Sequence, residues 1–146
     1  MSPRILLVDE HPTVRQALRG LLESEGLDVV GEARDGAEVP GLARELCADV
    51  VVLDVTRPVS RCLDAAREIV RTVPLKGVIL VAFEDYLVAQ ALQAGVRGYV
   101  LKSRVVEELP LAIRAVARGE IYVSPDISLA SLAACRTETD NISLAI

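Results

Sequence analysis

The most constraining feature of the sequence is an uninterrupted apolar run that ends in an acid. Residues 50–53 read Val-Val-Val-Leu without alternation, and Asp54 follows them directly. A run of this kind is typical of a strand buried on both faces of a parallel sheet. Ligands of open α/β sheets bind at the C-terminal ends of such strands. Asp54 is therefore the first candidate for a functional residue.

The same strand-then-charge pattern occurs at two other places in the chain. Residues 5–8 are apolar and run into Asp9 and Glu10, and residues 98–101 run into Lys102. If these segments are neighbouring parallel strands, their charged residues lie at one edge of the sheet. The sequence thus predicts a site that combines three carboxylates with one ammonium group.

Strand and helix patterns alternate along the first 120 or so residues. The expected strands cover residues 4–8, 27–33, 49–53, 78–82 and 98–101, and the expected helices cover 12–24, a short segment that starts near 40, 61–71, 86–93 and 105–118. This alternation predicts an α/β fold with a doubly wound, five-stranded parallel sheet. The flavodoxin-like strand order 2-1-3-4-5 suits a sheet of this size and places strands 1, 3 and 5 near its middle.

Length and composition are consistent with one such domain. The 146 residues are 51% hydrophobic, with one Phe and no Trp, so we expect a core of Ala, Val, Leu and Ile. The predicted domain covers residues 1–124. Residues 125–146 are expected to be a C-terminal extension or linker, with room for one short helix after Pro125.

The charge distribution argues against direct binding to nucleic acid or to an anionic membrane. The net charge is −5, and Lys and Arg are scattered rather than clustered. The sequence contains neither a secretory signal pattern nor an apolar run of the roughly 20 residues that a membrane helix needs. We therefore expect a cytoplasmic protein without membrane contact. Cys47, Cys62 and Cys135 lack the close pairing of a metal or redox site and are interpreted as free thiols.

The predicted charges permit phosphoryl transfer. Asp9, Glu10 and Asp54 contribute three negative charges, which Mg²⁺ and Lys102 would balance. At this position, the Asp54 carboxylate can attack phosphorus and form an aspartyl phosphate. The metal and the ammonium would stabilise the charge on the transferring group.

Taken together, these motifs resemble the receiver domain of two-component response regulators. The resemblance covers residues 4 to about 124, and residues 8–12 and 119–125 are similar to receivers of LuxR/FixJ-type transcriptional regulators. It implies that a histidine kinase phosphorylates Asp54, and that Asp9, Glu10 and the backbone carbonyl of Thr56 hold Mg²⁺ with Asp54. It also implies that Lys102 bridges to the phosphoryl group and that the protein forms a homodimer. DNA would be bound only through a domain absent from this chain.

The sequence departs from that pattern at the switch. Receivers usually carry Thr or Ser where this chain has Ala82, so the hydroxyl that couples to the strand-five aromatic, here Tyr99, is missing. Tyr99 is interpreted either as part of the switch or as a half-buried strand aromatic. Arg57 stands where Met is common, and we expect it to modify the site by reaching the carboxylates. Glu10 is longer than the usual Asp.

Three functional classes remain open. The first is a receiver that is phosphorylated on Asp54, and the second is an atypical receiver that acts as a phosphorylation-independent dimerisation or partner-binding module. The third is a Mg²⁺-dependent phosphatase of the haloacid dehalogenase type. That family needs a second Asp two residues after the first, and here the position is Thr56. Apart from its own phosphorylation, we therefore expect no enzymatic activity.

Overall fold

The computed structural model describes residues 2–127 and is built around a parallel sheet. The sheet has six strands in the order β2-β1-β3-β4-β5-β6. The strands are β1 (Arg4–Val8), β2 (Asp28–Ala33), β3 (Val50–Asp54), β4 (Gly77–Ala82), β5 (Gly98–Leu101) and β6 (Tyr122–Val123). The predicted α/β fold and the order of its first five strands are confirmed.

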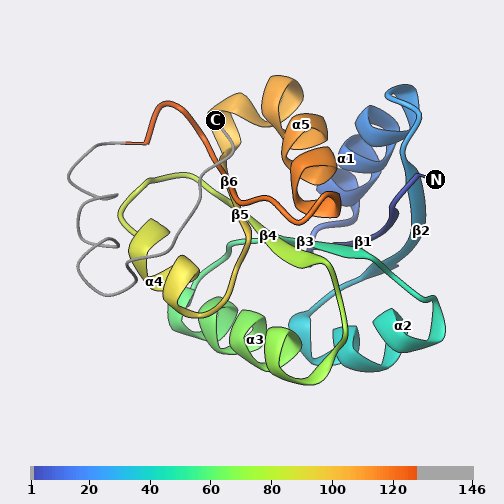
Figure 1. Cartoon of the computed structure of the whole chain (residues 1–146), viewed down its shortest axis with the longest axis horizontal. Helices are drawn as coiled ribbons and strands as arrows, with labels where there is room; N and C mark the ends of the chain where they lie inside the picture. Colours follow the sequence, from blue (N-terminus) through green and yellow to red (C-terminus); the bar gives the residue numbers. More distant parts are fainter. Residues whose placement is uncertain (1, 128–146) are drawn as a thin grey trace.

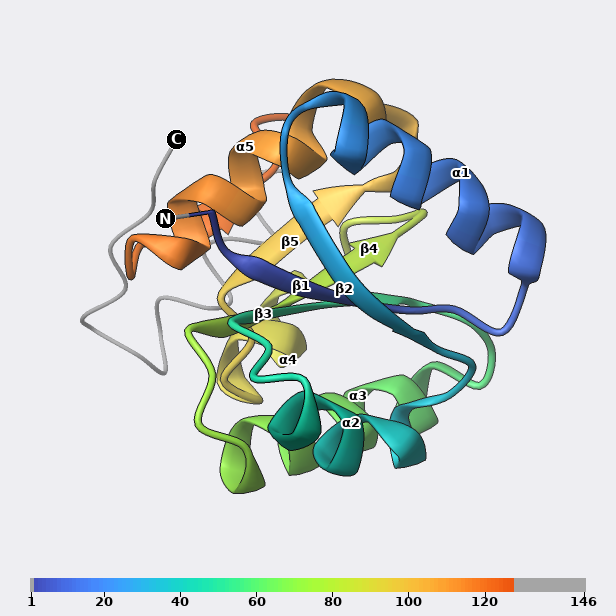
Figure 2. The ribbon, with the colours of Figure 1, turned by 90° about the vertical axis from the view of Figure 1, so that its right-hand side faces the viewer.

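Helices cover both faces of the sheet (Figures 1 and 2). They are α1 (Pro12–Ser24), α2 (Val39–Glu45), α3 (Val59–Thr72), α4 (Val88–Gln93) and α5 (Val105–Ala117), with single 3₁₀ turns η1 at Gly36–Glu38 and η2 at Lys102–Arg104. Figure 1 shows α1 and α5 on one face and α2, α3 and α4 on the other. Each face therefore has an apolar core of its own.

The central strands are buried because helices cover both of their faces. All five residues of β3 and all six of β4 are buried, as the absence of alternation in the sequence predicts. Alternate β3 residues enter opposite cores, so that Val51 packs on the α3 side and Val52 on the α5 side. This packing on both faces fixes the register of β3 against its neighbouring strands, so that their C-terminal ends lie at the same edge of the sheet.

Proline and glycine set the ends of several helices. Pro12 lies in the first turn of α1, and Gly26 follows that helix with a φ of +77°. Pro40 lies in the first turn of α2, so this helix starts as late as the sequence predicts. The helix predicted for residues 86–93 is shorter, because the chain turns before Val88.

The five-strand prediction needs one correction at the edge of the sheet. β6 pairs in parallel with β5, with Tyr122 beside Gly98 and Val123 beside Tyr99. Just after β6, Ser124 Oγ accepts a hydrogen bond of 3.0 Å from the Leu101 amide. A strand of two residues is too short to give a sequence pattern of its own, since it is defined by its pairing with β5.

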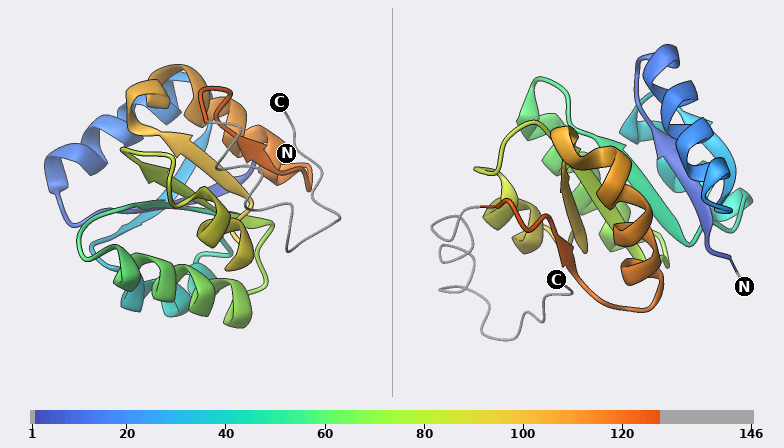
Figure 3. Two further views of the ribbon diagram at one scale, coloured as in Figure 1. Left: turned by 90° about the vertical axis from the view of Figure 1, so that its left-hand side faces the viewer. Right: turned by 90° about the horizontal axis from the view of Figure 1, so that it is seen from above.

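The right-hand view of Figure 3 shows the chain passing from α5 back along β5 before residue 127. The short helix predicted after Pro125 involves residues up to 133 and so lies outside the described residues. Among residues 2–127, the structure has no helix long and apolar enough to cross a membrane.

Candidate functional site: a crevice at the carboxyl ends of the strands

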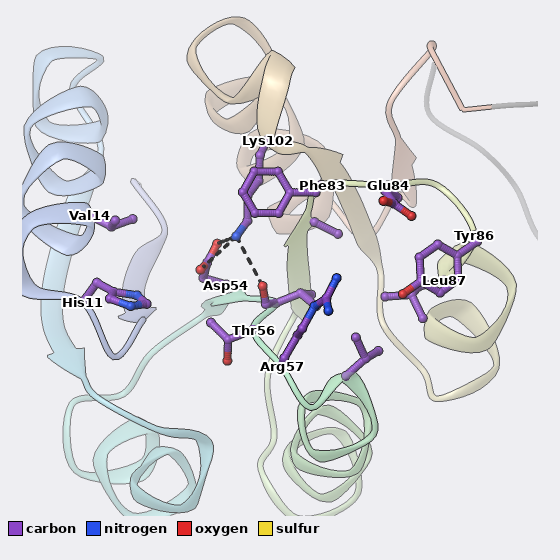
Figure 4. Close-up of a pocket in the computed structure, with 13 residues that line it drawn as sticks. His11, Val14, Asp54, Thr56, Arg57, Phe83, Glu84, Tyr86, Leu87 and Lys102 are labelled. Carbon is purple, nitrogen blue, oxygen red and sulfur yellow. Dashed lines mark hydrogen bonds and ion pairs between the residues drawn. The ribbon is translucent and has the colours of Figure 1, made fainter.

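Three of the predicted site residues meet at one edge of the sheet. Asp9 follows β1, Asp54 ends β3, and Lys102 follows β5. Lys102 Nζ lies 3.0 Å from Asp54 Oδ1 and 3.2 Å from Oδ2 (Figure 4). The same ammonium donates to the Val55 carbonyl at 3.2 Å. These contacts hold a lysine from one strand against an acid two strands away.

The sheet register explains why these groups meet. β1 and β3 are neighbours, and Val8 pairs with Leu53, so Asp9 and Asp54 leave the sheet side by side. β4 lies between β3 and β5 and ends in Ala82. Both acids are almost inaccessible to solvent, at 2% exposure for Asp9 and 8% for Asp54.

Burial dominates the titration of Asp54. It raises the pKa of this carboxyl from 3.8 to about 6, while Lys102 lowers the pKa and the nearby Asp9 raises it further. One ammonium therefore compensates only part of the cost of burying Asp54 next to Asp9. A site of this kind favours an additional cation.

The Asp9 carboxylate has an oxygen that fits this requirement. Asp9 Oδ1 accepts a hydrogen bond of 2.8 Å from the His11 amide, and His11 Nδ1 lies 3.1 Å from the same atom. Asp9 Oδ2 is buried and has no hydrogen-bond partner among the described residues. A buried carboxylate oxygen without a donor is costly unless a cation is bound. Hard oxygen ligands of this kind suit Mg²⁺.

The other predicted metal ligands are placed less uniformly. Asp9, Glu10, Asp54 and Thr56 all line one small cavity of about 90 Å³. The Glu10 side chain, however, is 57% exposed, and its Oε1 lies 3.8 Å from His11 Nε2. Within the described residues, no three His, Cys, Asp or Glu side chains are arranged as a metal site. The predicted convergence therefore holds for Asp9, Asp54 and Lys102, but not for the Glu10 carboxylate.

Cys62, interpreted from the sequence only as a free thiol, contacts the loop after β3. Cys62 lies in the first turns of α3, and its Sγ accepts a hydrogen bond from the Thr56 amide at 3.3 Å. Its thiol also donates to the Thr56 carbonyl at 3.2 Å. Cys62 is buried with Ala66 and Ile69, a spacing of four and then three residues, and this pattern could have placed it on the inner face.

On the β4 side of the crevice, the strand ends in Ala82, which has no hydroxyl. Ala82 is 1% exposed, and Tyr99, fully buried, packs in the same core. The Tyr99 hydroxyl donates to the Glu84 backbone carbonyl at 2.6 Å. Burial raises the pKa of this phenol well above its usual value. Tyr99 is thus fully buried rather than half-buried and has a main-chain partner, and its part in the switch stays a prediction.

Arg57 does not contact the acids. Its side chain is exposed, and among the described residues it makes no ion pair or hydrogen bond with Asp9, Glu10 or Asp54. Figure 4 shows the guanidinium on the side of the loop that faces Leu87, apart from Asp54. The expectation that Arg57 modifies the site through the carboxylates therefore has no contact to support it.

A second residue that sequence reasoning missed is Phe83, directly after β4. It lines a larger cavity of about 550 Å³ that also includes Asp54, Lys102, Ala82 and Tyr86. The Phe83 side chain is 78% exposed, yet its ring centre lies 4.1 Å from Lys102 Nζ (Figure 4). The only sequence signal was its position after the strand and near the lysine-bearing strand end.

Comparisons with known proteins agree with this geometry. The response regulator receiver domain family matches residues 5–114. The chain is 41% identical over 128 residues to the response regulator GacA of Pseudomonas aeruginosa, covering 86% of this chain and 60% of that protein. It is 39% identical over 127 residues to the response regulator UvrY of Escherichia coli, covering 85% of this chain and 58% of that one. The chain thus spans about three fifths of the length of these relatives.

Solved structures give the same result. A two-component response regulator of the LuxR family from Aurantimonas superposes with a TM-score of 0.80 at 35% identity, covering 97% of this chain and 100% of that one. The receiver domain of a putative NarL response regulator from Mycobacterium tuberculosis gives a TM-score of 0.71 at 32% identity, covering 82% and 98%. The family match covers most of this chain, and Asp9, Asp54 and Lys102 meet in the crevice. This chain therefore belongs to the response regulator receiver domain family.

Proposed function

We propose that Asp54 accepts a phosphoryl group from a partner histidine kinase and that Mg²⁺ assists the transfer. The observation that carries the proposal is the contact of buried Asp54 with Lys102, beside an Asp9 oxygen that lacks a hydrogen-bond donor among the described residues. A nucleophilic carboxylate, an ammonium and a metal-binding carboxylate are the groups that phosphoryl transfer requires.

In this mechanism an Asp54 oxygen attacks phosphorus as the bond from phosphorus to the donor nitrogen breaks. Asp54 is mostly ionised at pH 7, because its pKa is about 6. Lys102 shifts a hydrogen bond from the Asp54 carboxylate to a phosphoryl oxygen while the Val55 carbonyl keeps its ammonium in place. When bound, Mg²⁺ would be held by Asp9, Asp54 and the Thr56 carbonyl and would neutralise charge on the phosphoryl oxygens.

The contribution of Glu10 requires a change of its side chain. In the structure Glu10 lies beside His11 and is largely exposed. A rotation of this side chain toward Asp9 would add a ligand, directly or through a water molecule, because Mg²⁺ usually retains several waters. Glu10 is therefore assigned the peripheral position in the metal site.

We place this receiver in residues 1–124 of the regulatory part of a LuxR-type transcriptional regulator in the cytoplasm. Support comes from the relatives GacA and UvrY, which are response regulators longer than this chain, and from the similar structure of a LuxR-family response regulator. DNA binding would belong to a domain absent from this chain, and residues 125–146 would form an extension or linker toward it. The partners are then a histidine kinase and a second copy of the chain.

A second candidate function is a phosphorylation-independent module that dimerises or binds a partner constitutively. The position of Tyr99 favours it, since this residue is already buried and bonded to Glu84 without a hydroxyl at position 82. If the buried aromatic represents the only populated state, phosphorylation has no rotamer change to drive.

Phosphorylation with a small donor separates the two functions. The protein is incubated with Mg²⁺ and acetyl phosphate, and the adduct is measured by intact mass in wild type and in Asp54→Asn. The first function predicts an adduct that depends on Mg²⁺ and on Asp54, together with a change in oligomeric state on adding beryllofluoride. Absence of both adduct and beryllofluoride binding contradicts it, whereas a dimer of equal stability in every condition supports the second function.

A further inference from the structure

Phe83 is exposed in a way that its apolar character does not explain. An aromatic ring gains most by burial, yet Phe83 remains 78% accessible at the mouth of the crevice. Its ring faces Lys102 Nζ at 4.1 Å, which is within the range of a cation–π contact (Figure 4). The contact that the structure shows for this exposed ring is therefore with a cation.

The ammonium of Lys102 contacts this ring in addition to its oxygen partners. A lysine ammonium carries three N–H donors and no acceptor. Both Asp54 carboxylate oxygens and the Val55 carbonyl lie within 3.2 Å of the ammonium. The Phe83 ring lies over the same ammonium, and its negative face adds an electrostatic attraction to these oxygen contacts.

We propose that Phe83 is a positioning residue that holds the Lys102 ammonium over Asp54 through the face of its ring. The inference goes beyond the proposed phosphoryl transfer, because it assigns a role to a side chain that touches neither metal nor phosphorus. It rests on the proposed function only where the consequence for ligand binding is concerned.

The expected consequence follows from how Lys102 works. To stabilise a phosphoryl group, the ammonium has to exchange a carboxylate oxygen for a phosphoryl oxygen without leaving the crevice. With Ala82 at the end of β4, no side-chain hydroxyl from that position can hold the phosphoryl group. A ring over the ammonium limits its motion and excludes water from one side, which strengthens its interaction with anions.

The chain offers a matched control for this inference. Tyr86 is an aromatic residue in the same β4–α4 connection, lines the same cavity and is 59% exposed. Figure 4 shows its ring toward α4, on the far side of the crevice from Lys102. Tyr86→Leu therefore removes an exposed aromatic side chain without removing the contact with the ammonium.

A spectroscopic test reads the contact directly. The chain has two lysines, Lys76 and Lys102, so NMR of lysine-labelled protein gives two sets of ε-methylene signals. The Lys102 signals should be shifted upfield by the ring current in wild type and in Tyr86→Leu, and this shift should disappear in Phe83→Leu. Phe83→Tyr should retain it. An unchanged Lys102 shift in Phe83→Leu overturns the proposal.

A binding test reads the consequence. With Mg²⁺ present, beryllofluoride should bind Phe83→Leu about threefold more weakly than wild type, as expected for an exposed cation–π contact. Phe83→Tyr should restore the affinity and Tyr86→Leu should leave it unchanged, whereas equal affinity in Phe83→Leu and wild type overturns the positioning role. If wild type does not bind beryllofluoride at all, the proposed function fails, and the NMR comparison still decides the role of Phe83.

Discussion

The two halves of the crevice differ in how much of the receiver pattern they keep. The acidic half, made of Asp9, Asp54 and Thr56, contains the carboxylate proposed as the nucleophile, a buried carboxylate oxygen without a hydrogen-bond donor among the described residues, and a loop residue that lines the same cavity. The switch half, made of Ala82, Phe83 and Tyr99, lacks the hydroxyl and has its aromatic already buried. If Asp54 is phosphorylated as proposed, accepting the phosphoryl group and responding to it depend on separate sets of residues, and the hydroxyl is missing from the second set.

Lys102 connects the two halves, and its removal should have the largest effect. Lys102→Met takes away the only ammonium bonded to Asp54 among the described residues, and with it the proposed stabilisation of phosphoryl charge. We expect the rate of phosphorylation by acetyl phosphate to fall about 100-fold. The rate is followed by intact mass over time at saturating Mg²⁺.

Lys76→Met is the control, because this lysine precedes β4 at the opposite end of the sheet. Its phosphorylation rate should equal that of wild type. If Lys102→Met were phosphorylated as fast as wild type, the acidic half would have to work alone, and the description of Lys102 as the connection between the halves would be incorrect.

Restoring a hydroxyl tests what the switch half has lost. Ala82→Thr places a donor at the end of β4, and one hydrogen bond to a charged phosphoryl mimic should tighten beryllofluoride binding about tenfold. Ala82 is 1% exposed, so the added atoms should also lower the free energy of unfolding by about 1–3 kcal/mol. Both quantities are measured, by ligand titration and by urea denaturation.

Ala82→Val separates packing from hydrogen bonding. Valine adds a similar volume without the hydroxyl, so it should show the loss of stability but no tighter binding. Equal affinities for Ala82→Thr and Ala82→Val would mean that the missing hydroxyl is not what weakens the switch half.

The pH dependence of stability tests the electrostatics of the acidic half. The pKa of Asp54 is raised from 3.8 to about 6 in the folded protein, so the folded state binds more protons than the unfolded state between these values. In metal-free protein this carboxyl therefore lowers stability as the pH rises from about 4 to 6. A pKa difference of one corresponds to about 1.4 kcal/mol.

Asp54→Asn removes this titration, so it should be more stable than wild type by about 1–3 kcal/mol at pH 8, with the difference closing near pH 4. Urea denaturation in EDTA at several pH values measures it, and adding Mg²⁺ at pH 8 should narrow the gap by stabilising wild type. Asp64→Asn, an exposed α3 residue, should change stability little at any pH. If the difference in stability between Asp54→Asn and wild type did not vary with pH, burial would not be what sets the pKa of Asp54.

The sequence predicted the fold well because that information is local and repeated. Each signal is contained within a few residues. The signals are the apolar runs of β3 and β4, the prolines in the first turns of α1 and α2, and Gly26 after α1. β6 escaped prediction because its two residues are defined by pairing with β5, a contact between segments more than twenty residues apart. Non-local pairing of so short a segment leaves no periodic signal.

The site residues also divide into those that local sequence patterns predict and those that depend on non-local contacts. Asp9, Asp54 and Lys102 were predictable because strand order alone brings the ends of β1, β3 and β5 together. The direction of the Glu10 side chain and the ring of Phe83 over Lys102 were not, because both depend on rotamers of exposed residues. Charged groups at strand ends can be read from a sequence, whereas the side chains that orient them require the structure.

The smallest expected effect concerns the thiol beneath the acidic half. Cys62 contacts both the amide and the carbonyl of Thr56, so it orients the carbonyl proposed to face the metal. Cys62→Ala should weaken Mg²⁺ binding about two- to threefold, because weak hydrogen bonds to sulfur contribute little free energy. Cys62→Ser should recover part of the loss, since a hydroxyl donates and accepts but reaches less far.

Cys47 provides the matched comparison, because it is an exposed cysteine outside the crevice. Cys47→Ala should bind Mg²⁺ as wild type does, measured by competition with a fluorescent chelator at pH 8. Equal Mg²⁺ affinity for Cys62→Ala and wild type would show that α3 and the β3 backbone orient Thr56 without the thiol. The geometry of the acidic half would then depend on strand-end residues alone. The order of the strands in the sheet would be enough to keep these residues apart from the switch half.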